Sequence, residues 1–191
     1  VVSNRVGSLH GVSRAGGLAV ALAAALKEHG GVWFGWSGDV TEQPEPRVKT
    51  QSAGKVTRAT LDLRKEEHED YYNGFANRCL WPLFHFRIDL TAYDRRYYDG
   101  YQRVNRHFAH SLYPLLKEDD TLWIHDYHLI AIGETLRAMG ARQRMGFFLH
   151  IPFPMREVLA TLPHHDHLVQ ALFAYDLIGF QTQGDVQRFR D

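Results

Sequence analysis

The chain has 191 residues, 45% of them hydrophobic, and its 22 basic side chains equal its 22 acidic ones in number. That length and composition support a buried core in one domain or one and a half, and they exclude a disordered tail. The balanced charge excludes the long-range attraction that draws a protein to nucleic acid or an anionic membrane, so recognition of a phosphate must be local.

The cysteine content and the hydropathy favour a cytoplasmic protein. Cys79 is the single cysteine, so no internal disulfide can form. No apolar run approaches the roughly 20 residues that span a bilayer. The chain begins at Val1 without methionine or a signal-peptide pattern, and residues 181–191 predict the start of a helix. We therefore expect a piece of a longer protein.

Short β-branched or aromatic runs alternate along the chain with longer segments of helical period. This alternation is typical of a parallel sheet wrapped by helices, so the predicted fold class is α/β. Apolar stripes predict helices around residues 18–26, 101–115 and 129–139, with Gly140 as a helix stop. The segment Thr41 to Gly54, with Pro44 and Pro46, predicts a surface loop. The predicted strands are residues 1–4, 32–36, 56–63, 122–125, 145–151 and 177–181.

The first candidate site joins Arg5, at the end of the first strand, to Gly16 and Gly17, which open the first helix. A strand, a glycine loop and a helix N-terminus together favour an anion, because free backbone N–H groups and the helix dipole point at one spot. The alternative is a tight turn without a ligand. The pattern is neither a dinucleotide fingerprint nor a P-loop, since the glycine spacing and the lysine are missing.

The second candidate site is Asp126, which follows an apolar strand and stands between His125 and His128. The carboxyl ends of strands face the ligand crevice in open α/β sheets, so this carboxylate could bind a sugar hydroxyl. Two alternatives stay open. The three side chains could hold a metal ion, or Asp126 could only cap the helix.

The third candidate is His150, which a second buried strand delivers to the same edge of the sheet, just before Pro152 and Pro154. A lone histidine could equally be a satisfied core residue. A second polar strand end beside Asp126 favours a binding site.

Aromatic residues with polar tips form a fourth group, within residues 69–75 and 80–85. Tyrosine and tryptophan suit the apolar faces and hydroxyl edges of a sugar ring, and core packing is the alternative. The histidine-rich residues 164–167 have the composition of a metal site, but they begin a helical stripe through Leu168 and Leu172. We interpret them as a solvated helix start.

The motifs that follow one another along the chain are Val2-Ser3-Asn4-Arg5, Ala15-Gly16-Gly17-Leu18, Trp33-Phe34-Gly35-Trp36-Ser37-Gly38, Tyr71-Tyr72-Asn73, Leu80-Trp81-Pro82, Trp123-Ile124-His125-Asp126-Tyr127-His128 and Phe148-Leu149-His150-Ile151-Pro152-Phe153-Pro154. Taken together in this order, they resemble the trehalose-6-phosphate synthase family of glycosyltransferases across nearly the whole chain. The resemblance implies a two-domain GT-B fold of paired Rossmann-like halves, with helices on both faces of each sheet. Residues 1–191 would form the N-terminal, acceptor-binding half, without the nucleotide-sugar half.

The resemblance implies transfer of glucose from UDP-glucose, or another nucleoside-diphosphate glucose, to glucose-6-phosphate with retention, without a metal or other cofactor. For the acceptor, it implies that Arg5 holds the phosphate, that Tyr72 and Trp81 line the glucose-6-phosphate pocket, and that Asp126 binds hydroxyls. A guanidinium is a sound phosphate partner.

For the donor, the resemblance implies that Gly16 and Gly17 lie against the sugar and diphosphate, with Trp36 supporting that loop. His150 would contact the donor glucose near the reacting centre, so His150 and Asp126 are the expected catalytic residues. In such enzymes, the cations that hold the leaving group are an arginine and a lysine of the second half, so residues 1–191 alone should be inactive.

Two departures from the family pattern and three rival interpretations remain. The loop after Arg5 lacks an expected proline, and Met155 and Arg156 stand where small or polar residues are commoner. The rivals are a glucosylglycerol-phosphate synthase, a silent sugar-phosphate sensor or regulatory subunit, and a metal-dependent hydrolase built on His125, Asp126 and His128. Tyr72 and Trp81 favour a ring-sized acceptor over glycerol-3-phosphate.

Overall fold

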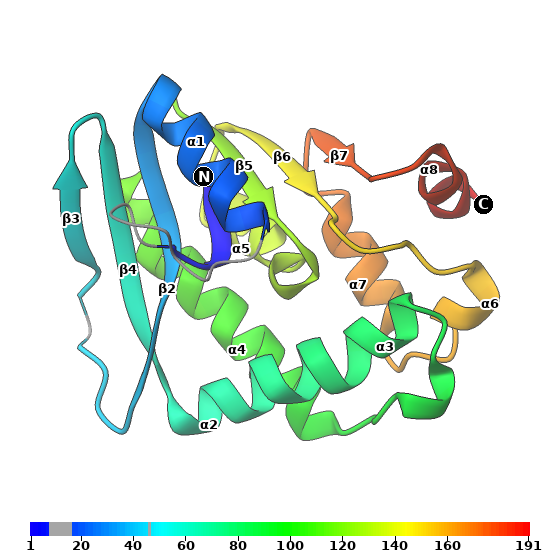
Figure 1. Cartoon of the computed structure of the whole chain (residues 1–191). Helices are drawn as coiled ribbons and strands as arrows, with labels where there is room; N and C mark the ends of the chain where they lie inside the picture. The colour runs from blue at the N-terminus through cyan, green and yellow to red at the C-terminus, as the bar shows by residue number, and fades with distance from the viewer. Residues whose placement is uncertain (8–16, 46) are drawn as a thin grey trace. The chain divides into compact units, whose positions relative to one another are not determined.

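The computed structural model describes residues 1–7, 17–45 and 47–191. They form two compact units, Val1–Lys65 and Glu66–Asp191, and each combines strands and helices (Figure 1). The α/β class is therefore confirmed. The assignment of residues 1–191 to one acceptor-binding domain stays a prediction. The expectations placed on Gly16 and Pro46 lie outside the described residues.

The first unit is a sheet with strand order β3-β4-β2-β1, in which β1, β2 and β4 are mutually parallel neighbours. The predicted helix is α1, and its Leu22 and Leu26 pack into a core with Val6, Trp33 and Val56. Burial of this stripe docks the helix on its sheet. The elements are β1 (Val2–Arg5), α1 (Gly17–His29), β2 (Gly31–Thr41), β3 (Lys49–Ala53) and β4 (Val56–Arg64).

The predicted loop between Thr41 and Gly54 is wrong in its second half, where the chain forms β3. This strand pairs antiparallel with β4, with Lys49 opposite Thr60 and Ala53 opposite Val56. Four of its five residues are exposed, so the strand carries no apolar alternation that a sequence pattern could detect. It also makes the sheet mostly rather than wholly parallel.

The second unit has three parallel strands in the order β5-β6-β7. Its apolar helical stripes are buried as predicted except at their ends, where Leu115 and Met139 are half-buried. Gly140 has φ 97° just past α5, which confirms the helix stop. The elements are η1 (His68–Leu80), α3 (Trp81–Phe84), η2 (Ile88–Leu90), α4 (Arg95–Leu112), η3 (Tyr113–Leu115), β5 (Thr121–His125), η4 (Tyr127–Leu129), α5 (Ile132–Ala138), β6 (Arg144–Phe148), α6 (Arg156–Leu159), α7 (His165–Leu172), β7 (Leu177–Gly179) and α8 (Gln183–Arg190). The short α2 (Lys65–Glu67) spans the boundary between the units.

Two predicted strands end earlier than expected. β6 stops at Phe148 rather than Ile151, because the backbone N–H of His150 donates to the Asp126 side chain and Pro152 has no N–H for a ladder. β7 stops at Gly179 rather than Gln181.

The aromatic segment for which no helix was predicted is a helix throughout. η1 is a π-helix of 13 residues, and α4 packs against it (Figure 1). The approach is close at Gly100, where a Cβ atom would lie 2.4 Å from the Cβ of Asp70. Tyr71 and Phe75 of η1 are buried against Tyr101 of α4. For these residues of the aromatic group, the core-packing alternative is therefore correct.

Candidate active site

The ends of β5 and β6 bring Asp126 and His150 together. The backbone N–H of Asp126 donates to Phe148 O at 2.8 Å. Its Oδ1 accepts from the backbone N–H groups of Tyr127 at 3.0 Å and His150 at 3.3 Å. Oδ1 is therefore committed to the protein, while no partner of Oδ2 is found among the described residues. This arrangement leaves one carboxylate oxygen for a ligand.

Asp126 holds an unusual backbone conformation, with φ 77° and ψ 163°, a region populated essentially by glycine. Burial raises the pKa of its carboxyl, and hydrogen bonds from the Tyr127 and His150 backbone together with the nearby rings of His150 and His85 oppose that rise. The helix-cap alternative is partly right, since Asp126 is the N-cap of η4. A cap alone explains neither the strained backbone nor the unoccupied oxygen.

Three buried polar side chains hold the backbone that follows Asp126. The hydroxyl of Tyr101 donates to Tyr127 O at 2.8 Å and accepts from Ile130 N at 3.1 Å. One turn further along α4, Asn105 donates to His128 O at 3.1 Å. The hydroxyl of Tyr175 donates to the carbonyls of residues 129 and 130, both at 3.0 Å, and accepts from the N–H of residue 133. Hydrogen bonds from these buried side chains therefore hold the backbone of the turn in place.

His150 is half-buried, and its Nε2 lies 2.9 Å from Nδ1 of His125. His125 is 1% exposed, and burial together with the neighbouring His150 lowers its pKa to about 3. Burial also lowers the pKa of His150, against the opposing effect of Asp126. Both imidazoles are therefore neutral near neutral pH.

Tyr72 lies in a stack of rings beside this edge. Its ring is 5.2 Å from that of His68 and 5.7 Å from that of His128, both nearly parallel to it. His128 also packs against Tyr127 at 4.0 Å, and burial lowers the pKa of His128 to about 3. Burial raises the pKa of Tyr127, and the nearby Asp126 and Tyr72 raise it further, so Tyr72 belongs to the same neighbourhood as Asp126.

These contacts bear on the metal alternative. The ring of His128 lies among tyrosines, while His125 is bonded to His150. Within residues 1–7, 17–45 and 47–191, no group of three His, Cys, Asp or Glu side chains is placed to hold a metal ion.

Trp81 opens α3 and is 44% exposed, although it is a large aromatic residue. Its ring lies 4.1 Å from that of His85, whose Nδ1 contacts Trp81 O at 2.7 Å. His85 is near enough to Asp126 to affect the pKa of its carboxyl. Tyr72, Trp81, Asp126 and His150 thus gather in the second unit around one edge of its sheet.

Two contributors to this edge were missed. The sequence pattern places His85 in the aromatic group and predicts no further role for it. Asn77 lies in none of the sequence motifs, yet its Oδ1 accepts a hydrogen bond from the hydroxyl of Tyr127 at 3.1 Å. The helical spacing of Asn77 from Trp81 could have indicated a shared face only if η1 had been recognised as a helix.

In the first unit, Arg5 ends β1 with its guanidinium 5.7 Å from the centre of the Trp36 ring. Gly38 has φ 99°, and a Cβ there would lie 2.6 Å from Nε of Arg5, so glycine makes room for the guanidinium. No carboxylate among the described residues is ion-paired with Arg5. Gly17 is the first residue of α1, and no atom lies within 4 Å of a Cβ placed on it.

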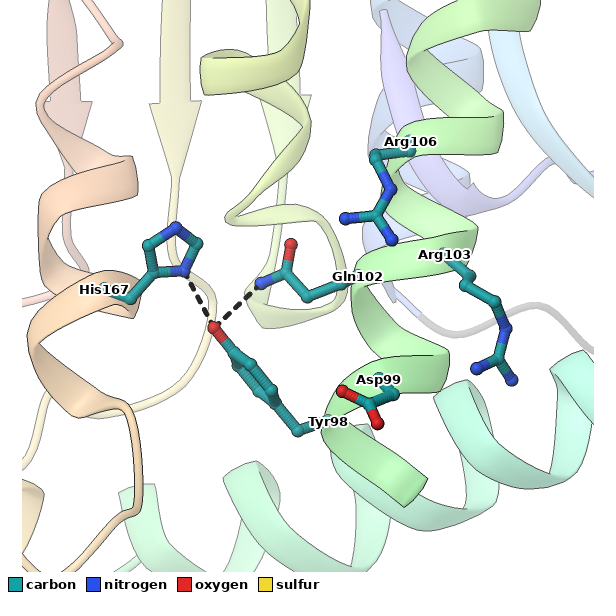
Figure 2. Close-up of a pocket in the computed structure, with 6 residues that line it drawn as sticks. All are labelled: Tyr98, Asp99, Gln102, Arg103, Arg106 and His167. Carbon is teal, nitrogen blue, oxygen red and sulfur yellow. Dashed lines mark hydrogen bonds between the residues drawn. The ribbon is translucent and has the colours of Figure 1, made fainter. Parts of the chain in front are cut away.

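A separate polar pocket of about 500 Å³ lies between α4 and α7 (Figure 2) and contains none of the predicted site residues. The hydroxyl of Tyr98 lies 2.8 Å from Nδ1 of His167 and accepts from Gln102. Arg103 is paired with Asp70. The predicted helix start at residues 164–167 is confirmed by α7, but His167 is only half-buried rather than fully solvated.

An α/β chain that brings a carboxylate and a histidine to neighbouring strand ends, with aromatic rings beside them, has the features of an open-sheet protein whose ligand site lies at the carboxyl ends of its strands. The chain belongs to glycosyltransferase family 20, whose model matches residues 5–191. This match confirms the resemblance found in the motifs.

Relatives agree with the family assignment. The trehalose-6-phosphate synthase of Enterobacter sp. (strain 638) is 49% identical over 99% of this chain and 40% of its own length. That of Sinorhizobium fredii (strain NBRC 101917 / NGR234) is 50% identical over 99% of this chain and 42% of its own length. The chain therefore spans about two fifths of the curated relatives it matches.

Solved structures show the same fold. The chain has a TM-score of 0.92 and 53% identity to a UDP-forming α,α-trehalose-phosphate synthase from Burkholderia xenovorans, crystallised with glucose-6-phosphate. The match covers 98% of this chain and 41% of that one. Among the helices that the structure describes, none has the length and apolar character needed to cross a bilayer.

Proposed function

We propose that this chain is the acceptor-binding part of an α,α-trehalose-phosphate synthase. The whole protein would transfer glucose from UDP-glucose to glucose-6-phosphate with retention, giving trehalose-6-phosphate and UDP. The observation that carries the proposal is the 53% identity, over 98% of this chain, to a synthase crystallised with glucose-6-phosphate. The gathering of Asp126, His150, Tyr72 and Trp81 supports it.

In this proposal the acceptor is bound by one ion pair to its phosphate, by aromatic contacts to its sugar ring and by a hydrogen bond to a hydroxyl. Arg5 pairs with the phosphate, because its guanidinium is held over Trp36 and is not neutralised by a carboxylate among the described residues. The exposed ring of Trp81 offers an apolar face to the glucose ring, and Tyr72, whose ring is stacked on those of His68 and His128, lines the pocket beside it. Asp126 accepts a hydroxyl through Oδ2.

The donor sugar contacts His150, and Gly17 lies against the diphosphate, as does Gly16. The acceptor hydroxyl attacks from the face that the diphosphate leaves, so no protein nucleophile takes part. The transition state gathers positive charge on the sugar and negative charge on the diphosphate, so catalysis depends on positioning and on cations. We assign those cations to residues outside this chain, and we expect residues 1–191 alone to bind without turnover.

The deciding test is titration with glucose-6-phosphate and, separately, glycerol-3-phosphate, followed by amide chemical shifts. We expect a preference for glucose-6-phosphate that is lost in Arg5→Ala and in Trp81→Ala. Matched controls are Arg95→Ala, at an exposed arginine of α4, and Phe173→Ala, at an aromatic residue that is 71% exposed. Both should leave binding unchanged.

The outcomes separate the rivals. A preference for glycerol-3-phosphate would favour a glucosylglycerol-phosphate synthase. A folded chain that binds neither phosphate would overturn the acceptor assignment. If the whole protein bound both substrates without turnover, we would assign it as a regulatory homologue and not as an enzyme.

The protein would work in the cytoplasm, with UDP-glucose and glucose-6-phosphate as its partners and without nucleic acid or membrane, and it would form a homo-oligomer. The buried, unpaired Cys79 supports a reducing compartment. Sedimentation of the whole protein would test the oligomer, and cell fractionation would test the location.

A further inference from the structure

His125 has no part in the proposed reaction, yet it forms the closest polar contact that the described residues make with the His150 ring. It is buried, and its Nδ1 lies 2.9 Å from Nε2 of His150. Its other nitrogen, Nε2, is also buried and finds no hydrogen-bond partner in the described part of the chain. These two facts together limit where the protons can lie.

A hydrogen bond between two neutral imidazoles can have two arrangements. If Nδ1–H of His125 donates to Nε2 of His150, the lone buried Nε2 of His125 is a bare acceptor. If Nε2–H of His150 donates instead, that buried Nε2 must carry a hydrogen. A buried N–H without an acceptor is rarer and more costly than an under-used acceptor. The first arrangement is therefore favoured.

The favoured arrangement determines what His150 offers to a ligand. A neutral His150 that accepts at Nε2 must carry its hydrogen on Nδ1. In the described residues Nδ1 of His150 has no partner, since Asp126 binds the backbone N–H of His150 and not its ring. The half-buried His150 ring therefore carries at Nδ1 an N–H group that can donate to a ligand, and no acceptor there.

We propose that His125 is a positioning residue that holds His150 as the Nδ1–H tautomer, so that His150 donates a hydrogen bond to an oxygen of its ligand. The identity of that ligand as a nucleotide sugar rests on the proposed function. The tautomer itself does not, because it follows from the two histidines alone.

The test is a long-range ¹H–¹⁵N correlation spectrum of the ¹⁵N-labelled whole protein, which distinguishes protonated from unprotonated ring nitrogens. We expect the wild type to show His150 with a protonated Nδ1 and an unprotonated Nε2. In His125→Leu, which keeps bulk and loses the donor, the hydrogen should move to Nε2 in part of the population. His125→Asn retains a donor near the place of Nδ1 and should restore the wild-type pattern.

A wild-type His150 protonated at Nε2 would overturn the proposal, and so would a His125→Leu spectrum identical to that of the wild type. If His125→Leu does not fold, the wild-type spectrum still decides. UDP-glucose should bind more weakly to His125→Leu than to His125→Asn by the factor by which the Nδ1–H population of His150 falls, about twofold if half of the population shifts. Equal affinities would show that the tautomer of His150 does not affect binding of the nucleotide sugar.

The proposed function can fail separately. If His150 has the expected tautomer but its signals do not move when UDP-glucose is added, the role of His125 stands. The assignment of His150 to the donor sugar would then be withdrawn.

Discussion

Replacing Tyr101 with phenylalanine removes one oxygen atom from beneath the turn that carries Asp126. The hydroxyl makes two buried hydrogen bonds, to Tyr127 O at 2.8 Å and from Ile130 N at 3.1 Å. Tyr101 is 0% exposed, so water cannot replace the hydroxyl. Each backbone group left unpaired costs about 1–3 kcal/mol, so for the two groups we expect roughly 2–6 kcal/mol of lost stability.

Urea unfolding followed by circular dichroism measures this loss. The control is Tyr97→Phe, because the Tyr97 hydroxyl accepts a single exposed bond from Arg78 and its loss should cost less than about 0.5 kcal/mol. Tyr101→Phe should also weaken glucose-6-phosphate binding, since the turn shifts. Equal stability of the two variants would refute the reasoning and show that packing alone holds the turn.

Three further predictions concern other parts of the second unit. Gly100→Ala should cost about 1–3 kcal/mol, because its Cβ would meet Asp70 at 2.4 Å, whereas Gly184→Ala, with its nearest atom at 3.6 Å, should be neutral in the same urea assay. Asp126→Asn should weaken glucose-6-phosphate binding without loss of stability at neutral pH. Burial raises the pKa of Asp126 above its ordinary 3.8, so wild-type stability falls as pH rises through that raised pKa, and the variant should lose this dependence. Cys79, whose pKa burial raises to about 12, should react with iodoacetamide only after unfolding, as mass spectrometry can measure.

Each of these has an opposite outcome that would count against it. Equal stabilities of the two glycine variants would mean that η1 and α4 can move apart cheaply. Unchanged pH dependence in Asp126→Asn would place the responsible group elsewhere. Rapid alkylation of the folded protein would mean that the thiol is reached by local opening.

The features predicted correctly from the sequence are those that follow from periodicity. Apolar runs predicted β5 and β6, and the rule that strand ends face a ligand crevice brought Asp126 and His150 together. The roles expected of Tyr72 and Trp81 came from the resemblance and not from spacing, since an aromatic residue at one position is compatible with core or surface.

The missed features have no periodic signal. β3 is exposed on nearly every residue, so its pairing depends on β4 rather than on its own composition. The polar side chains of Tyr101, Asn105 and Tyr175 bind backbone atoms far away in sequence, and such contacts exist only once the chain has folded. The contact of His125 with His150 is of the same kind.

The strained backbone of Asp126 has a consequence for engineering. Glycine at this position would relieve roughly 1–3 kcal/mol of backbone strain. It would lose two hydrogen bonds that are only part-buried, so water can reach the freed N–H groups and each bond has a net worth of about 0.5–1.5 kcal/mol. The two effects roughly cancel, so selection for thermal stability alone would not maintain aspartate at position 126. A screen that selects only for thermal stability, without a binding step, would accept glycine in place of Asp126. The selected protein would be stable but would no longer bind its ligand.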